Sequence, residues 1–389
     1  MESPPIYGLP QETLQNIFSS LPLRQIMICR SVCKLFNQIL TSSSFVHLIS
    51  TENPPLSLLA LRPPHHHRQP PNSPFLLHAF DPNQNQWLRF NLSFLPFRSL
   101  HPIASSPGLV YIWADSPDSL DSNKLLIACN PLTRQYRVLP QLGSAWFKHG
   151  SVLVDSANRV MVLTELASLF FTNSNHWLKF SSDLPSKPRC PILVSNSVYT
   201  LCDVGSAWRN EWKLYSCKLS TLMNSQQFWN RLEKHEWGDV FDILKRPRLV
   251  RGKGNRLLMI GGLKSSFSLN SPCSTILILR LDLDLLEWEE AGRMPVEMYR
   301  IFQESSKFKV FGMGESVIFS AKRHGRLALW ECGKGGGGEW RWIDGLQGTG
   351  DGPCRGFVFE IIAALEAKFS THWRLHGDWR RLEMVLEGI

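Results

Sequence analysis

Residues 9–45 read LPQETLQNIFSSLPLRQIMICRSVCKLFNQILTSSSF and decide the architecture of the N-terminal part of the chain. Apolar residues recur there at helical spacing, and prolines or serines divide them into short segments. The spacing predicts one helix that opens at Leu9-Pro10 and ends before Pro22. A second helix begins at Leu23, a third ends at Leu40, and a short apolar turn follows at 45–49. Three helices this short cannot bury all their apolar surface among themselves. The exposed remainder predicts either a partner site or an internal interface.

From about residue 55 the pattern changes to short strands. Five segments read as hairpins, with two apolar strands around a polar or glycine turn: 103–112, 152–163, 192–201, 248–260 and 308–319. A second unit recurs between them: a strand, an aromatic residue, a short polar or apolar stretch, and then a proline or an equivalent turn. Copies lie at 80–96, 130–140, 172–185 and 281–295, with looser ones around 229–237 and at 331–342.

One hairpin plus one such unit gives about four strands at a period of roughly 40–60 residues, which is the requirement for a propeller blade. The chain is therefore predicted to be mainly β, with a three-helix N-terminal module followed by a six-bladed β-propeller. One four-stranded blade leaves both of its faces apolar, and stacking the blades in a ring buries these faces. Residues 356–362 are predicted to add a closing strand. The repeated tryptophans are interpreted as packing between blades.

The F-box is the known module that the stretch 9–45 resembles. Its pattern places a second Leu-Pro after an amphipathic helix and then Arg-x-Val-Cys-Lys and an aromatic residue, which residues 21–22, 30–34 and 36 match. Phe36 stands where that family often has Trp, and Gln25 stands where Asp is common. The segment Gly261-Gly262, with a tryptophan and a Met-Pro farther on, resembles the kelch repeat. The chain as a whole resembles the plant Skp-interacting-partner group of F-box proteins.

This resemblance implies a non-catalytic, substrate-recognition subunit of a Skp–cullin–F-box (SCF) ubiquitin ligase. The implied partners are a Skp-type adaptor, through it a cullin and a RING subunit, and an unidentified target protein held by the propeller. The implied adaptor-binding residues are Leu9, Pro10, Leu14, Ile17, Leu21, Pro22, Leu23, Ile26 and Val32. For each of these nine residues, a position in the internal hydrophobic core is the alternative. The implied domains are an F-box at 5–50, a kelch-like propeller at 51–365, and a tail or short helix at 366–389.

Composition limits the other possibilities. No apolar run approaches the roughly 20 residues that span a bilayer, so no membrane partner is expected. The nine scattered cysteines contain no Cys-x-x-Cys pair, which favours reduced thiols in the nucleus or cytoplasm. The net charge is +9, and the densest basic run, 245–253, is interpreted as the entry to a hairpin rather than as a nucleic-acid site.

Catalytic and metal motifs are not evident in the sequence. His65-His66-His67 lies among prolines and predicts a loop, and the glycine-rich segment 333–338 lacks the order of a phosphate loop. No cysteine stands in an electropositive sequence motif. An oxidase with a copper site is the alternative enzyme, but no His-rich set recurs in several blades. We expect no cofactor and no metal. A ligase-independent scaffold with the same two domains is the second alternative.

Overall fold

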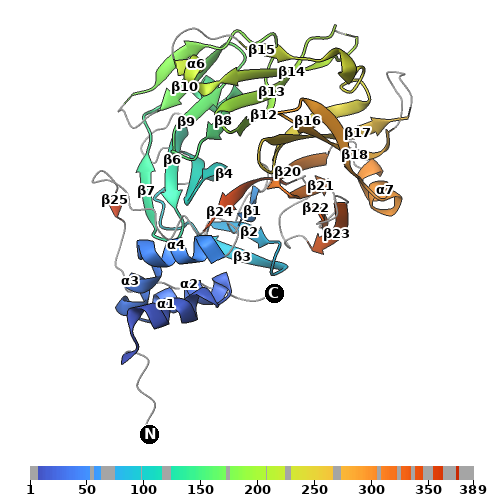
Figure 1. Ribbon diagram of the computed structural model, residues 1–389. Coiled ribbons are helices and arrows are strands. Elements are labelled where there is room, and N and C mark those ends of the chain that lie inside the picture. The colour runs from blue at the N-terminus through green and yellow to red at the C-terminus, as the bar shows by residue number, and fades with distance from the viewer. Residues whose placement is uncertain are drawn as a thin grey trace.

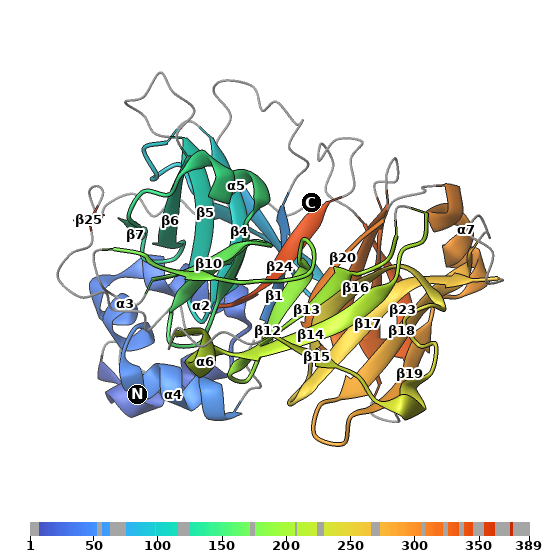
Figure 2. The same ribbon diagram turned by 90° about the horizontal axis from the view of Figure 1, so that it is seen from above.

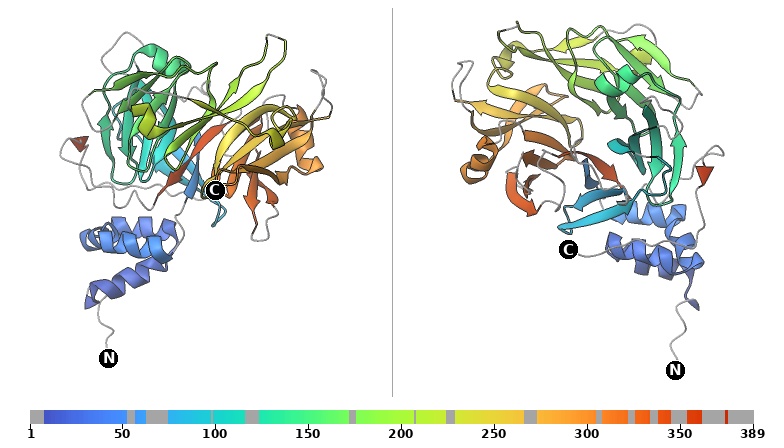
Figure 3. Two further views of the ribbon diagram at one scale, coloured as in Figure 1. Left: turned by 45° about the horizontal axis from the view of Figure 1, so that its top comes forward. Right: turned by 180° about the vertical axis from the view of Figure 1, so that it is seen from behind.

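The computed structural model shows four helices at the N-terminus followed by β-sheets arranged around a ring (Figure 1). The structure describes residues 8–52, 57–62, 75–97, 99–115, 124–171, 176–206, 208–223, 229–265, 273–304, 308–321, 326–333, 338–344, 354–361 and 374–375. The four N-terminal helices lie together on one side of the ring (Figures 2 and 3).

The N-terminal helices are α1 (Gln11–Ser19), α2 (Leu23–Val32), α3 (Lys34–Leu40) and α4 (Ser43–Glu52). The prediction of three helices followed by an apolar turn is wrong at its end, because residues 45–49 belong to a fourth helix of ten residues. Phe45, Val46 and Ile49 of α4 are buried in the same core as the other helices. These contacts with the neighbouring helices stabilise a segment that had seemed too short to be helical by itself.

Three of the five sheets have four strands each. The first has the order β24 (Arg355–Glu360), β1 (Ser57–Arg62), β2 (Leu76–Asp81), β3 (Gln86–Asn91). The second has the order β11 (Leu178–Ser181), β10 (Ala167–Phe171), β9 (Val160–Leu163), β8 (Ser151–Val154). The third has the order β12 (Arg189–Val194), β13 (Ser197–Asp203), β14 (Trp212–Lys218), β15 (Asn230–Leu232).

The other two sheets are larger. A five-stranded sheet has the order β25 (Arg374–Leu375), β7 (Gln135–Val138), β6 (Lys124–Asn130), β5 (Leu109–Asp115), β4 (Leu100–Ser106). An eight-stranded sheet has the order β19 (Glu287–Arg293), β18 (Cys273–Asp282), β17 (Arg256–Lys264), β16 (Leu244–Gly252), β20 (Phe308–Gly314), β21 (Ser316–Ala321), β22 (Arg326–Cys332), β23 (Gly338–Asp344). Short helices connect some strands: α5 (Ser144–His149), α6 (Leu219–Met223), the 3₁₀ helix η2 (His235–Trp237) and α7 (Val296–Glu304).

The sheets are arranged as in a propeller. Neighbouring strands form a closed cycle of contacts in which β24 meets β4, β4 meets β8, β8 meets β12, β12 meets β16, β16 meets β20, and β20 meets β24. The ring is closed by β24, which pairs antiparallel with β1 from Ser57 opposite Glu360 to Arg62 opposite Arg355. The predicted closing strand is thus confirmed. The five predicted hairpins are also confirmed, as the pairs β4–β5, β8–β9, β12–β13, β16–β17 and β20–β21.

Asp81, Asn130 and Asp282 each end a strand and hold the turn that follows it. One side-chain oxygen of each accepts the backbone N–H groups two and three residues later, at 2.9 to 3.2 Å. The residue four positions later has a positive φ and the residue six positions later is aromatic: Asn85 and Trp87, Arg134 and Tyr136, Leu286 and Trp288. The sequence repeat therefore reflects a local turn chemistry. The predicted copy at 172–175 lies outside the described residues.

Replacing Asn130 by Ala is expected to lower the free energy of unfolding by about 1–3 kcal/mol. Asn130 is fully buried, so the amides of Leu132 and Thr133 would lose their acceptor without gaining water. Urea denaturation measures the change. Asn91→Ala is the matched control, because Asn91 accepts the Ser93 amide in the same way at an exposed position. Equal losses in the two variants would contradict this account.

Tryptophan side chains join neighbouring sheets. The indole N–H of Trp87 donates to the carbonyl of Asp344 at 3.0 Å, and that of Trp177 donates to Pro140 at 2.8 Å. The indole of Trp237 donates to Leu286 at 2.8 Å. In each case donor and acceptor belong to different sheets or to the turns beside them. The predicted packing role is confirmed for these three residues.

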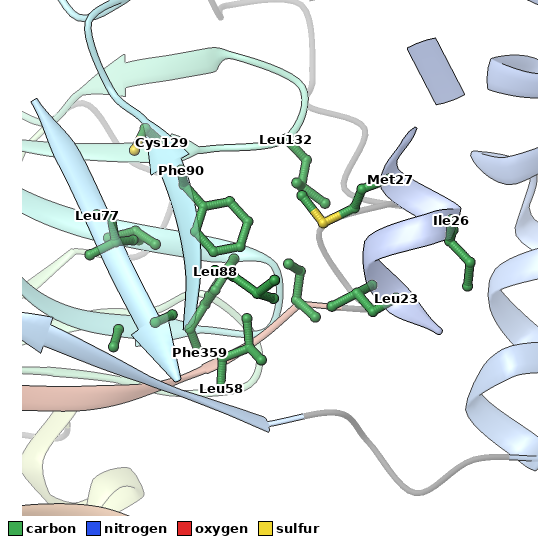
Figure 4. Packing of buried hydrophobic residues seen from close by; sticks show 14 of the residues in the cluster. Leu23, Ile26, Met27, Leu58, Leu77, Leu88, Phe90, Cys129, Leu132 and Phe359 are labelled. Atoms are coloured by element: carbon green, nitrogen blue, oxygen red, sulfur yellow. The ribbon is translucent and has the colours of Figure 1, made fainter. Parts of the chain in front are cut away.

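The helices and the ring share one hydrophobic core. Leu23 and Met27 of α2 belong to the same cluster of buried side chains as Leu88, Leu132 and Phe359 of the sheets. Figure 4 shows the two α2 side chains pointing toward these sheet residues. The N-terminal module is therefore packed on the propeller-like ring.

Several predictions fall on residues that the structure does not describe. The triple histidine at 65–67 and the glycines at 335–337 lie outside the described residues. Within 366–389 only β25 is described, and it pairs with β7. In the part of the chain that is described, no helix is long and apolar enough to cross a membrane. Among the same residues, no three His, Cys, Asp or Glu side chains gather as a metal site.

Candidate adaptor-binding surface

Two prolines start the first two helices. Pro10 and Pro22 directly precede α1 and α2 with nearly identical extended backbones, φ −56° and ψ 147° for the first and φ −57° and ψ 149° for the second. Their carbonyls accept the amides of Leu14 and Ile26, each at 3.1 Å. Proline suits this place because it donates no N–H and its φ is fixed. Pro22 therefore begins α2, and α1 already ends at Ser19.

Cys33 forms the corner between α2 and α3. Its backbone is extended, with φ −156° and ψ 167°, and this interrupts the helical path directly after Val32. The Cys33 Sγ then accepts the amide of Phe36 at 3.4 Å, at the position where a Ser or Asp usually caps a helix. The Val-Cys-Lys segment of the sequence motif is thus a turn between two helices.

Buried polar contacts fix the helices relative to one another. The side-chain amide of Gln15 on α1 donates to the hydroxyls of Ser42 and Ser44, at 3.3 and 2.8 Å, beside the start of α4. Arg30 on α2 donates from Nε to the side-chain Oδ1 of Asn37 on α3 at 3.3 Å, and burial lowers the pKa of Arg30 to about 10. These contacts join α1 to the start of α4 and α2 to α3.

The structure divides the nine predicted adaptor-binding residues into three groups. Leu14, Leu23 and Ile26 are buried, at 1%, 7% and 4% exposure, and belong to the internal core. Leu9 and Leu21 are half-buried against that core. The exposed residues are Pro10, Ile17, Pro22 and Val32. The three buried residues are corrected to core, because helices α1 to α4 and the sheets already cover them.

Two exposed apolar residues were missed by the sequence analysis. Ile28 is 43% exposed and Leu35 is 39% exposed, and both lie close in sequence to Val32, which is 58% exposed. Ile28 and Val32 are four residues apart on α2 and so are neighbours on one face. Leu35 follows across the Cys33 corner. We call Ile28, Val32 and Leu35 the α2–α3 apolar patch.

This patch faces away from the core. At about 100° per residue, Ile28 and Val32 lie on the side of α2 opposite Leu23 and Met27, which contact the ring. The four-residue spacing of Ile28 and Val32 is the sequence signal for this patch. Apolar residues outside the core stripe of an amphipathic helix are candidates for a partner surface.

Comparisons with known proteins agree with this geometry. The F-box domain family matches residues 6–48, which contain α1, α2 and α3 and most of α4. SKP1-interacting partner 15 of Arabidopsis thaliana is 65% identical over 378 residues, which cover 94% of this chain and 100% of that protein. The Arabidopsis thaliana protein UNUSUAL FLORAL ORGANS is 25% identical over 373 residues, covering 88% of this chain and 80% of that protein.

Solved structures resemble the chain only distantly. A chain from the crystal structure of a nidogen/laminin complex has a TM-score of 0.47 and 9% identity, covering 78% of this chain and 97% of that chain. A likeness of this size adds nothing to the description of the fold or the function.

Proposed function

Because this chain belongs to the plant F-box proteins of the SKP1-interacting partner group, we propose that it is the substrate-recognition subunit of an SCF ubiquitin ligase. The observation that carries the proposal is the α2–α3 apolar patch, which the F-box leaves exposed while its opposite side packs on the ring. A partner that buries this patch would be fixed rigidly relative to the sheets. The chain would then act by holding a target close to the transferring enzyme, without bond chemistry of its own.

The proposed adaptor is a Skp-type protein, and the proposed further subunits are a cullin and a RING protein. Mixing the purified chain with these components and separating them by size is the direct test. A single species containing the chain, adaptor, cullin and RING supports the ligase subunit. If the adaptor co-elutes with the chain while the cullin stays separate, the ligase-independent scaffold is the better description.

We further propose that the sheets are six kelch-like blades and that they hold the target. The eight-stranded sheet supports this count, since its halves β16–β19 and β20–β23 are separate antiparallel units joined by one short parallel contact at Arg251–Met313 and Gly252–Gly314. Gly261 supports the kelch-like assignment, because the neighbouring strand approaches it too closely for a larger residue. A Cβ at this position would lie 3.1 Å from the carbonyl oxygen of Lys245 on that strand. An experimental structure with a different number of four-stranded units would reject the count.

The proposed domain limits are 5–50 for the F-box, 51–365 for the propeller and 366–389 for the tail.

The proposed location is the nucleus or the cytoplasm. All nine cysteines are free thiols, which is compatible with a reducing compartment. Fluorescent fusion of the full chain in plant cells tests the location, and accumulation in the secretory pathway would reject it.

A further inference from the structure

The face of the ring opposite the F-box carries a concentration of positive charge. The F-box joins the ring through β1, whose first residue, Ser57, pairs with Glu360 at the end of β24. Arg355 starts β24 and pairs with Arg62, at the other end of the same strand. Five steps along a strand correspond to roughly 17 Å. Arg355 and the F-box connection therefore lie at opposite ends of the innermost strand.

Four consecutive inner strands each contribute a cation. Arg189, Lys309 and Arg355 are the first or second residues of β12, β20 and β24, and Arg248 lies in the middle of β16. We call these residues the inner-strand basic cluster. The basic run 245–253 noted in the sequence forms β16 and the turn after it, which confirms its hairpin interpretation.

Side chains of the cluster connect the strands on which they lie. Arg189 donates from Nε to the carbonyl of Pro247 on β16 at 3.0 Å, and its guanidinium lies 4.9 Å from the Trp212 ring centre. Arg248 donates from Nη2 to the carbonyl of Phe308 on β20 at 2.6 Å, with its guanidinium 4.4 Å from the Phe308 ring. Backbone oxygens and aromatic rings thus hold the two arginines in place, and none of these groups carries a negative charge.

The four side chains of the cluster differ in how deeply they are buried. Arg248 is buried, Arg189 and Lys309 are half-buried, and Arg355 is exposed. Among the described residues, no carboxylate forms an ion pair with any of the four. Burial, with the nearby Arg355 and Arg248 charges, lowers the pKa of Lys309 to about 8. Burial is the larger cause of this shift, and the neighbouring cations add to it.

Asp203 is the acidic group that acts on Arg189, and its own oxygens are already engaged. Asp203 Oδ1 accepts the amides of Gly205 and Glu211, at 3.1 and 2.9 Å, and Oδ2 accepts the side-chain amide of Asn210. Its charge therefore orders the loop between β13 and β14 and offsets only part of the cluster.

The same loop presents an exposed aromatic residue. Trp208 is 85% exposed, and the neighbouring Arg209 pairs with Asp242 at 3.1 Å, just before β16 begins. The loop leads into β14 at Trp212, the ring under Arg189. An exposed tryptophan close to arginines is the composition found at the centres of protein-binding surfaces.

We propose that the inner-strand basic cluster, with Trp208 at its edge, binds an acidic segment of the target protein. The proposal deepens the proposed function, on which it rests, by giving the chemistry of the target. Carboxylate or phosphate groups on an extended segment would enter among Arg355, Lys309 and Arg189, while an apolar residue of the segment would pack on Trp208. Binding at this face would leave the F-box free on the opposite face.

Fluorescence anisotropy on the full chain tests this proposal. The probes are labelled peptides of about twelve residues in which Ser alternates with Glu, with phosphoserine or with Lys. The variant Lys309→Gln/Arg355→Gln is expected to weaken binding of the anionic peptides about tenfold, and added salt should weaken binding by the unchanged chain. Lys253→Gln/Arg256→Gln is the matched control, because it removes two exposed cations from the other end of hairpin β16–β17. Trp208→Ala is expected to weaken binding without changing the salt dependence.

The glutamate and phosphoserine arms identify which anionic group the cluster prefers, and binding of either through the cluster supports the proposal. Absence of binding, equal weakening in both charge variants, or equal binding of the lysine peptide would overturn it. A labelled single-stranded RNA that binds through the cluster while the peptides do not would also overturn it. Adaptor pull-down on the same samples separates the two proposals, because intact adaptor binding with no peptide binding leaves the proposed function standing.

Discussion

Changing Ile28 and Val32 together to Lys is expected to abolish capture of an Arabidopsis SKP1-type adaptor, with a loss of affinity of about a hundredfold or more. Both side chains are exposed and face away from the shared core, so a partner that covers them must bury apolar atoms there. Two ammonium groups in that contact would have to be desolvated without a countercharge. Pull-down and titration calorimetry with the purified adaptor measure the loss.

The double change should leave the fold intact. Exposed substitutions of this kind usually alter the free energy of unfolding by no more than about 0.5 kcal/mol each, and a cation near the C-terminal end of α2 does not oppose the helix dipole. The control is Leu166→Lys/Leu285→Lys, which adds the same charge at apolar residues that are 78% and 62% exposed on the ring. Adaptor binding that survives in the α2 variant, or that disappears equally in the control, would remove the patch from the proposed function.

Local chemistry explains which parts of the fold were predictable. The turns after Asp81, Asn130 and Asp282 use contacts within a few residues, so the same letters recur wherever the turn recurs. The hairpins and the closing strand follow from runs of apolar residues bounded by turn residues. The fourth N-terminal helix was missed because α4 depends on contacts with α1 and α3 that its own sequence does not reveal.

The adaptor surface was only partly predictable because one helix serves two interfaces. The apolar stripe of α2 contains Leu23 and Ile26, which the sequence assigns to a partner as readily as to a core. For Leu23, contact with the ring decides the matter, and it is formed by residues such as Leu132 and Phe359 that lie far along the chain, whereas Ile26 points away from the sheets (Figure 4). Ile28 falls outside that stripe, and Leu35 belongs to the apolar stripe of the next helix, so neither was predicted to bind the adaptor, although their exposure makes them candidates.

The inner-strand basic cluster could not be predicted from the sequence, because its four residues come from four strands far apart in the chain. Arg248 stands in the basic run 245–253, but Arg189, Lys309 and Arg355 lie far from it in the sequence, and only the closed ring brings the four strands together.

Replacing Phe359 by Ala is expected to lower the free energy of unfolding by about 3–5 kcal/mol and to loosen the F-box as well as the ring. Phe359 is fully buried on the closing strand, where its ring meets the Phe90 ring edge-on at 6.0 Å between centres. It belongs to the same core cluster as Leu23 and Met27 of α2 (Figure 4). A cavity at this point therefore removes packing from the ring closure and from the support of α2. Urea denaturation measures the global loss, and hydrogen exchange of the α2 amides measures the local one.

The matched control is Phe319→Ala, since Phe319 is also a fully buried phenylalanine, but it lies on β21 in a separate core cluster. Both variants should lose comparable stability, because both leave a cavity of the same chemical kind. Only Phe359→Ala should speed exchange in α2 under native conditions, since local opening follows the contacts that are lost. If α2 exchanges equally fast in both variants, the ring and the F-box open as one cooperative unit and the shared cluster has no local role. If α2 is protected equally well in both variants, the F-box is stable without support from the ring. The claim that the ring holds the F-box rigidly relative to the basic face would then be wrong.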